Sequence, residues 1–320
     1  MNSSLRKSCL IAINDCMGLK KREKILIVCD ENKREIGLEL YDAALDQGNE
    51  ALYVEMRSRE MHGEEPPKEI AELMKKFDVV LCPTTKSLTH TQARREASES
   101  GVRIATFPGI TKDVMIRGLS ADYNAIYELT MKLKKMLDKT KIVKVTAKNG
   151  TDITLDVTDR KGYASHGLFH KKGESGNLPT GEAFLAPLEG KSNGIFVVDG
   201  SMAGVGMIED QPIKINVENG YATEITGGKE AMALLTILKR YDKDARNIAE
   251  FGIGTNHKAK LSGLLLEDEK VLGTVHIALG DNKSMGGNVH IPIHLDGVIK
   301  KPTVYFDDKL IMKEGKLLID

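Results

Sequence analysis

Hydrophobic and polar positions follow two alternating patterns in the first part of the chain. Short segments that are almost continuously apolar are typical of strands buried on both faces of a parallel sheet, and they lie at 24–30, 51–56, 78–83 and 103–107. In the segments between them, apolar residues recur every three or four positions, which predicts helices at 4–17, 33–46, 68–76, 89–100 and 120–138. This alternation of strand and helix predicts a doubly wound, Rossmann-like α/β domain with a parallel sheet over residues 1–141.

The pattern changes near residue 141. Segments 141–146 and 152–157 alternate in polarity, and the Asn149-Gly150 pair between them is typical of a β-hairpin turn. Glycine is frequent from here on, and one clear helical pattern occurs at 229–240. Residues 142–320 are therefore predicted to form a second, mostly β (α+β) domain, and a chain of 320 residues is about right for two domains.

Composition narrows the possible partners. Lys plus Arg and Asp plus Glu both number 46, which argues against a broad nucleic-acid-binding surface, and the few aromatic residues are not interleaved with basic runs. No segment approaches the roughly 18 apolar residues of a membrane span. Cysteines occur in the first third of the chain without a Cys-x-x-Cys pair, at Cys9, Cys16, Cys29 and Cys82. Reduced thiols and a cytoplasmic location are expected.

The first domain lacks the glycine-rich loop that binds nucleotide phosphates. The first predicted strand is followed by the acidic stretch Asp30-Glu-Asn-Lys, where a phosphate would need backbone amides and no nearby carboxylate. A scaffold or dimerisation domain is the preferred interpretation, with no nucleotide cofactor.

Two histidines and an aspartate in the second domain suggest metal chemistry. His294 and Asp296 are two residues apart in an apolar segment, so in a strand they point to the same side. His276 lies in another apolar run, and on a neighbouring strand it could complete a two-His, one-carboxylate set for a divalent metal ion. Taken alone, a His-x-Asp pattern is more often an ordinary strand feature.

Two glutamates in unusually apolar surroundings extend this set. Glu182 begins the segment Glu-Ala-Phe-Leu-Ala, and Glu250 lies in a glycine-rich apolar strand. A buried carboxylate requires a cation or strong donors. The alternatives to a metal are a strand-end charge or hairpin ion pair for Glu182 and, for Glu250, an ion pair with an Arg or Lys, for which Arg246 is near enough in sequence to consider. Five oxygen and nitrogen ligands suit two bridged divalent ions sharing a carboxylate and a hydroxide.

The second domain resembles the thermophilic metallopeptidases of the aminopeptidase T group. The resemblance rests on an ordered set of motifs at 176–184, 197–201, 250–256, 268–280 and 294–296, including Gly-Asn-Leu-Pro-Thr-Gly-Glu-Ala-Phe and Glu-Phe-Gly-Ile-Gly-Thr-Asn. It implies a dimeric aminopeptidase that removes N-terminal residues from peptides with a hydroxide activated by two zinc, cobalt or manganese ions. The family's ligands map onto Glu182, Glu250, His276, His294 and Asp296. The general base stays open between the two glutamates.

The chain departs from that group in three respects. The segment Asp281–Gly287 lacks the tyrosine that the group places after the histidine motif, with Lys283 as a candidate replacement. Leu295 stands where many members have tryptophan, and the chain is shorter than typical members. A related branch, the 2,5-dihydroxypyridine dioxygenases, is similarly short and uses one Fe(II) held by two His and one Asp. It is the alternative function, acting on a small molecule, and a catalytically inactive relative is the other.

Overall fold

The computed structural model describes residues 3–319. The chain forms two compact units, which are treated separately here. Unit 1 comprises the residues up to 127 together with 165–180, and unit 2 comprises 128–164 and the residues from 181 onward. The predicted single boundary after residue 141 differs from this division, because the segment 165–180 returns to unit 1. There, β8 (Ser175–Asn177) adds a parallel strand beside β4 (Arg103–Pro108).

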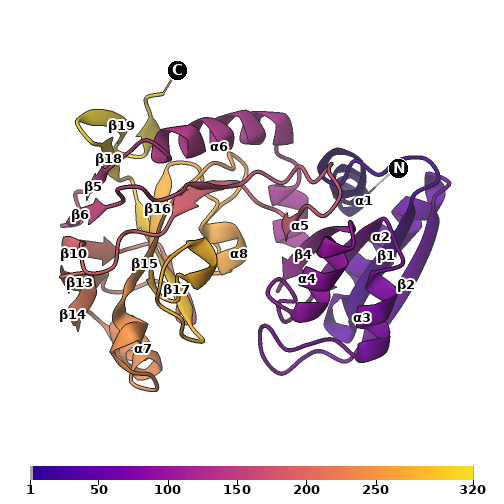
Figure 1. The fold of residues 1–320 in the computed structure, drawn as a ribbon, viewed down its shortest axis with the longest axis horizontal. Coiled ribbons are helices and arrows are strands. Elements are labelled where there is room, and N and C mark those ends of the chain that lie inside the picture. Colours follow the sequence, from indigo (N-terminus) through magenta and orange to yellow (C-terminus); the bar gives the residue numbers. More distant parts are fainter. Residues whose placement is uncertain (1–2, 320) are drawn as a thin grey trace. The chain divides into compact units, whose positions relative to one another are not determined.

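Unit 1 is built on a five-stranded parallel sheet with strand order β2-β1-β3-β4-β8 (Figure 1). Its first three strands in sequence are β1 (Lys24–Asp30), β2 (Glu50–Met56) and β3 (Val79–Thr84). The central strands β1, β3 and β4 are buried along almost their whole length. This burial explains why their sequences are continuously apolar instead of alternating.

Helices cover both faces of this sheet, as the doubly wound prediction requires. Leu26 and Val28 of β1 pack in one apolar cluster with residues of α3 and α4, whereas Cys29 points to the other face, where Gly37 of α2 lies against it. The helices are α1 (Ser4–Leu10), continued by a π-helical segment (Ile11–Cys16), α2 (Arg34–Asp46), α3 (Lys68–Met74), α4 (Gln92–Glu99) and α5 (Lys112–Gly118).

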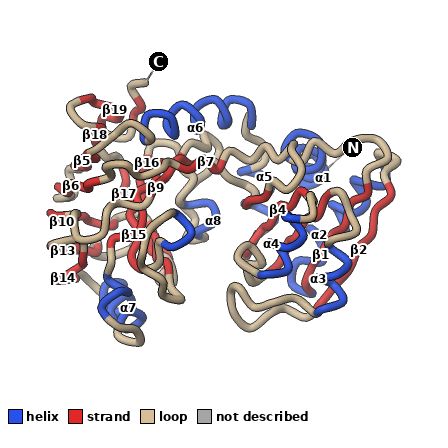
Figure 2. The backbone as a smooth tube through the Cα atoms, viewed as in Figure 1, coloured by secondary structure: helices blue, strands red, loops and turns tan. Residues whose placement is uncertain are grey.

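Unit 2 contains two antiparallel sheets, whose strands are red in Figure 2. The eight-stranded sheet runs β14 (Tyr221–Thr226), β13 (Ile213–Glu218), β10 (Asn193–Val198), β6 (Asp152–Asp156), β5 (Ile142–Thr146), β18 (Thr303–Phe306), β19 (Lys309–Lys313) and β20 (Lys316–Leu317). The seven-stranded sheet runs β12 (Gly206–Met207), β11 (Ser201–Met202), β17 (His294–Lys300), β16 (Thr274–Gly280), β15 (Ile248–Gly254), β9 (Glu182–Leu185) and β7 (Tyr163–Ser165).

One apolar core lies between the two sheets of unit 2. It contains alternate residues of the strands from both sheets, such as Phe196 of β10 and Phe251 of β15. The C-terminal half of α6 (Tyr123–Leu137) contributes Leu133 and Leu137. Helix α7 (Lys229–Leu238) packs on β13 and β14, and α8 (Leu265–Asp268) is a single short turn. We call the side of the seven-stranded sheet that enters this core its inner face, and the opposite side its outer face.

The structure confirms the predicted fold class. The predicted α/β alternation, the hairpin at Asn149-Gly150 and the mostly β second part with one clear helix are all present. The long helix expected at 120–138 is α6 at Tyr123–Leu137, and the separate helix α5 before it was not predicted. None of the helices among the described residues has the length and apolar character that a bilayer crossing requires.

Candidate metal centre

The outer face of the seven-stranded sheet brings all five predicted ligands together. Side chains of a strand alternate between its faces. In β16 the residues on either side of His276 enter the inner core, which directs His276 to the outer face. In β17 Leu295 enters the core, and His294 and Asp296 point outward. By the same alternation, Ala183 and Phe251 enter the core and turn Glu182 and Glu250 outward.

An irregularity in β15 helps to direct Glu250. The pairing of β15 with β16 shifts by one residue between Ile248 and Glu250. Ile248 and Phe251 both enter the inner core, which a regular strand would not allow because they are three residues apart. The bulge therefore turns Glu250 to the outer face beside His276, consistent with the general use of bulges to redirect a side chain near a functional site.

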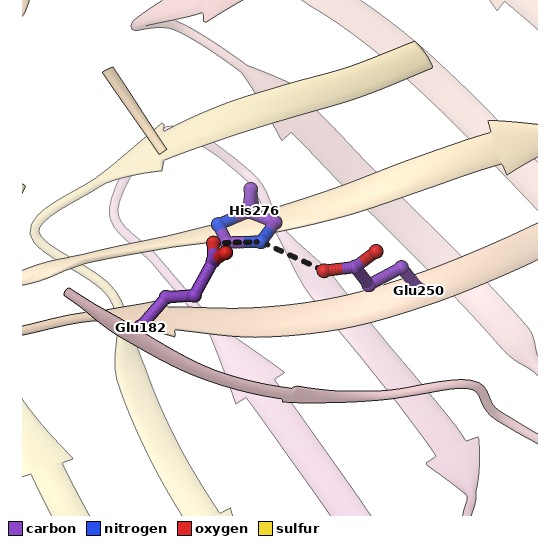
Figure 3. A group of neighbouring side chains, drawn as sticks. All are labelled: Glu182, Glu250 and His276. Atoms are coloured by element: carbon purple, nitrogen blue, oxygen red, sulfur yellow. Dashed lines mark hydrogen bonds and ion pairs between the residues drawn. The ribbon is translucent and has the colours of Figure 1, made fainter. Parts of the chain in front are cut away.

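Glu250 lies at the centre of the group and contacts both imidazoles. Its Oε1 is 3.2 Å from His276 Nε2, and its Oε2 is 3.0 Å from His294 Nε2. His294 Nε2 is also 3.4 Å from Asp296 Oδ1. Figure 3 shows Glu182 and Glu250 approaching the same edge of the His276 ring from neighbouring strands. The ligand atoms form two sets that share Glu250, one with Glu182 and His276 and one with His294 and Asp296.

Glu182 has a second partner that the sequence analysis missed. Lys270 Nζ donates to Glu182 Oε1 at 2.6 Å and also pairs with the Glu269 carboxylate. The other oxygen of Glu182 is 3.6 Å from His276 Nε2. The side chain of Lys270 is only 2% exposed, so its ammonium depends on these carboxylates to compensate for its lost hydration.

The backbone fixes the orientation of the His294 ring. His294 Nδ1 lies 2.7 Å from the carbonyl oxygen of Asp281. A carbonyl only accepts hydrogen bonds, so Nδ1 carries the proton and Nε2 is directed towards Glu250 and Asp296. The loop that supplies this carbonyl is held by Asn282, which is fully buried and donates to Glu189 Oε1 at 2.8 Å.

A glycine makes room for the His276 ring. Gly252 of β15 is paired with His276 of β16, and a Cβ atom at position 252 would lie 2.1 Å from His276 Nε2. No side chain fits at this distance, because it is far below van der Waals contact. The ring on the neighbouring strand therefore requires glycine at position 252 of β15.

The electrostatics of the site favour charged carboxylates and protonated imidazoles. Burial opposes charge on every group, but hydrogen bonds from His276 and His294 outweigh it and hold the pKa of Glu250 below its usual value. Burial likewise opposes charge on His276, and the carboxylates of Glu250 and Asp296 nevertheless raise its pKa to about 9. For Asp296, burial is again outweighed by neighbouring His294, which lowers its pKa.

The glutamates beside Lys270 behave differently. Burial raises the pKa of Glu182, in spite of the opposing charges of Lys270 and His276. Burial also dominates at Glu269 and raises its pKa to about 8. The two carboxylates raise the pKa of Lys270 against the effect of its burial. The two carboxylates therefore favour the charged form of Lys270 at this edge of the site.

This donor set fits a divalent metal ion. Among residues 3–319, Asp296 Oδ1 is a buried oxygen that makes no hydrogen bond. The two imidazole nitrogens aimed at carboxylates hold protons that an ion would replace, because metal binding requires neutral imidazole and ionised carboxylate. Two histidines with one carboxylate are the typical ligands of non-haem Fe(II), and the absence of thiolate argues against soft metals.

Two polar residues of the segment before β17 lie outside this group. His290 is exposed, and its Nδ1 is 2.9 Å from Asp281 Oδ1. The side chain of Lys283, the candidate replacement for the tyrosine of the aminopeptidase T group, is also exposed. The sequence did not reveal Lys270, because the charged run Glu267–Lys270 resembles a solvent-exposed turn, whereas in the structure Glu267 and Asp268 have no exposed surface.

Comparison with known proteins decides the family. The model of the NicX family, described as 2,5-dihydroxypyridine 5,6-dioxygenase, matches residues 7–319. The chain belongs to this family. A 2,5-dihydroxypyridine 5,6-dioxygenase from Pseudomonas putida is 24% identical to this NicX-family chain over 253 residues, which are 73% of this chain and 69% of that protein.

Two solved structures share the fold. The 2,5-dihydroxypyridine dioxygenase of Pseudomonas putida KT2440 superposes with a TM-score of 0.86 at 18% identity, over 100% of this chain and 98% of that one. Wild-type AmpT from Thermus thermophilus superposes with a TM-score of 0.66, also at 18% identity, over 99% of each chain. The likeness to AmpT supports a fold relationship with the aminopeptidase T group, but the family is NicX.

The predicted metalloaminopeptidase activity is wrong. The family match and the curated relative indicate a dioxygenase, an oxidoreductase, in place of a peptide hydrolase. The predicted pair of zinc, cobalt or manganese ions is likewise unsupported, whereas a group of histidines and carboxylates that could hold a metal ion is present. The error has a physical origin, since the same five side chains are suitable ligands for two hydrolytic metals or for one iron.

Proposed function

We propose that this protein is a mononuclear iron dioxygenase that opens a hydroxylated pyridine ring. The family match supports the reaction class. The observation that carries the proposal for this chain is that His294 lies beside Asp296 and that Glu250 contacts both His294 and His276 on one sheet face, because two histidines with one carboxylate are typical of non-haem Fe(II) oxygenases. A dihydroxypyridine is the substrate class that the name of the curated relative suggests.

His276, His294 and Asp296 would hold the iron, and Glu250 would orient both rings through its two oxygens. Bound iron would supply the redox chemistry that allows dioxygen to react with an electron-rich ring. Glu182, Glu250 and Asp296 are at most 7% exposed and His276 has no exposed surface, whereas the His294 side chain is 30% exposed, so these residues exclude water except on the side of His294. Exclusion of water strengthens the electrostatic contacts that fix the ligands.

The hydrogen bond from His294 Nδ1 to the Asp281 carbonyl gives that ring a defined role. It keeps the proton on Nδ1, which leaves Nε2 as the only nitrogen available to a metal. Glu250 Oε2, 3.0 Å from the same Nε2, would accept the proton that His294 releases when a metal binds. The chain thus provides both an oriented ligand and a local proton acceptor.

Oxygen uptake tests the proposal. Protein loaded anaerobically with Fe(II) is mixed with 2,5-dihydroxypyridine in aerated buffer, while an oxygen electrode and the ring absorbance are followed together. We expect one molecule of dioxygen consumed for each ring lost, with no uptake by the zinc-loaded protein. Asp296→Ala serves as the inactive control. Iron-loaded protein that consumes no dioxygen with this substrate or with other dihydroxylated rings would contradict the proposal.

The predicted homodimer stays a prediction. Sedimentation of the purified protein at several concentrations would test it directly, and the ring-cleavage proposal does not depend on the outcome.

A further inference from the structure

Lys270 introduces a fixed positive charge into a site that otherwise consists of metal-binding side chains. Its ammonium lies 2.6 Å from Glu182 Oε1 and pairs with Glu269, and the side chain is 2% exposed. Of the described lysines, only Lys270 is buried. Such a residue is costly to bury and is retained only where its partners compensate its charge.

The position of this ammonium determines what Glu182 can do. Glu182 and Glu250 both approach His276, and without Lys270 they would form one half of a five-ligand site for two ions (Figure 3). Lys270 takes Glu182 Oε1 as its hydrogen-bond acceptor. A divalent ion bound to this carboxylate would lie beside the ammonium, and like charges at such separations repel strongly in a buried site.

The other half of the group is not paired with Lys270. His294 Nε2 lies 3.0 Å from Glu250 Oε2 and 3.4 Å from Asp296 Oδ1, and no lysine or arginine among the described residues forms an ion pair with any of the three. His276 Nε2 is in contact with the same Glu250. One ion can therefore bind here without displacing a cation that is already present.

We propose that the Lys270 ammonium occupies the second cation position of this site, so that Glu182 is its counter-ion and the site accepts a single divalent metal ion. Lys270 is thus a positioning residue, which acts through Glu182 and Glu269. This inference deepens the proposed function. It rests on that function only in requiring that the site binds a metal ion.

Counting bound metal tests the inference. The protein is freed of metal, titrated anaerobically with Fe(II) and, separately, with Mn(II), passed through a desalting column and analysed for metal per chain. The wild-type protein is expected to retain one ion. Lys270→Met removes the charge but keeps a long side chain, and we expect it to retain a second ion. Lys270→Arg keeps the charge and is expected to retain one.

Two controls distinguish this role from a merely structural one. Lys144→Met removes a surface lysine of unit 2 that pairs with Asp152, and it should leave the count at one. Glu182→Gln should also retain one ion with an affinity within about threefold of the wild type, because Glu182 is not a ligand in this scheme. This variant keeps the shape of the side chain and leaves Lys270 paired with Glu269, so it remains informative if Lys270→Met fails to fold.

Three results would overturn the inference. They are two ions per wild-type chain, a folded Lys270→Met protein that still retains one ion, and loss of the metal in Glu182→Gln. Because the count is made without substrate, it is independent of the proposed reaction. One ion per chain without ring cleavage would contradict the dioxygenase proposal and leave the role of Lys270 intact.

Discussion

The two faces of the seven-stranded sheet are both shielded from solvent, but by opposite means. On the inner face, Val275, Ile277 and Leu279 of β16 join an apolar core and have no exposed surface. On the outer face of the same strand, His276 has no exposed surface either, yet its neighbours are carboxylates. The inner face gains stability from burial itself. The outer face is stable only if its charges compensate one another.

Within one strand, the inner face therefore stabilises the fold and the outer face provides the proposed metal ligands. The alternation of apolar and polar residues in β15, β16 and β17 is that of an ordinary half-exposed sheet. The structure shows that most of this polar side is buried too, with His294 partly exposed. Charged groups that are buried at a cost to stability are most often retained for chemistry. Substitutions on the two faces should therefore have separable effects on stability and on metal binding.

Removing an outer-face ligand should have the largest effect. We expect Asp296→Ala and His294→Ala to lose bound iron and all ring-cleaving activity, because each substitution removes one of three metal ligands. Elemental analysis and oxygen uptake measure the two losses. Asn216→Ala is the control that should retain both the iron and the activity. Asn216 is a half-buried residue of the eight-stranded sheet and is far in sequence from every predicted ligand. Full activity of either ligand variant would contradict the assignment.

Removing an inner-core residue should instead reduce stability. Phe196→Ala deletes a fully buried ring between the sheets, and such a change costs about 3–5 kcal/mol of unfolding free energy. Urea unfolding of the metal-free protein measures it. The folded fraction should still bind one iron per chain with nearly the wild-type affinity. Loss of iron from the folded variant would show that the two faces are not separable.

Filling the space at Gly252 should damage the site from the backbone side. A Cβ at this position would lie 2.1 Å from His276 Nε2, so the ring must move in Gly252→Ala. We expect metal affinity to fall by at least about tenfold, comparable to the loss of a group that orients a ligand. Gly228→Ala is the matched control, because its Cβ would meet nothing closer than 3.4 Å. Equal metal affinity of the two variants would contradict the steric role of Gly252.

A neutral polar pair in unit 2 should give the smallest effect. The buried hydroxyls of Thr130 and Thr255 are 2.7 Å apart. Thr130→Val leaves the Thr255 hydroxyl without this partner and should cost about 1–2 kcal/mol of unfolding free energy. The double variant with Thr255→Val should recover part of the loss, and neither should change metal content. A loss of metal in either variant would extend the functional region beyond the charged outer face.

Local patterns predicted most of the fold, because each element leaves its period in the sequence. The strand Lys24–Asp30 and the helix start at Lys229 coincide with the predicted positions. The return of segment 165–180 to unit 1 could not be predicted, because β8 is three residues long and its partner β4 lies about seventy residues earlier. A strand this short carries no period that can be recognised.

For the site, the sequence identified the five candidate side chains but not the contacts between them. Spacing placed His294 and Asp296 on one side of a strand, and the structure brings them beside Glu250. The burial of Lys270 could not be inferred, since its charged run resembles a turn in solvent, and its acceptor Glu182 is 88 positions away. In the proposed scheme, the number of metal ions depends on the pair of Lys270 and Glu182.

The most direct test of the proposed reaction is the origin of the oxygen atoms in the product. Fe(II)-loaded protein is allowed to turn over 2,5-dihydroxypyridine under ¹⁸O₂ in unlabelled water, and the product is analysed by mass spectrometry before exchange. A dioxygenase incorporates both atoms of dioxygen, so we predict a ring-opened product carrying two ¹⁸O atoms. A product whose new oxygen comes from water, or an intact ring despite bound iron, would contradict the account.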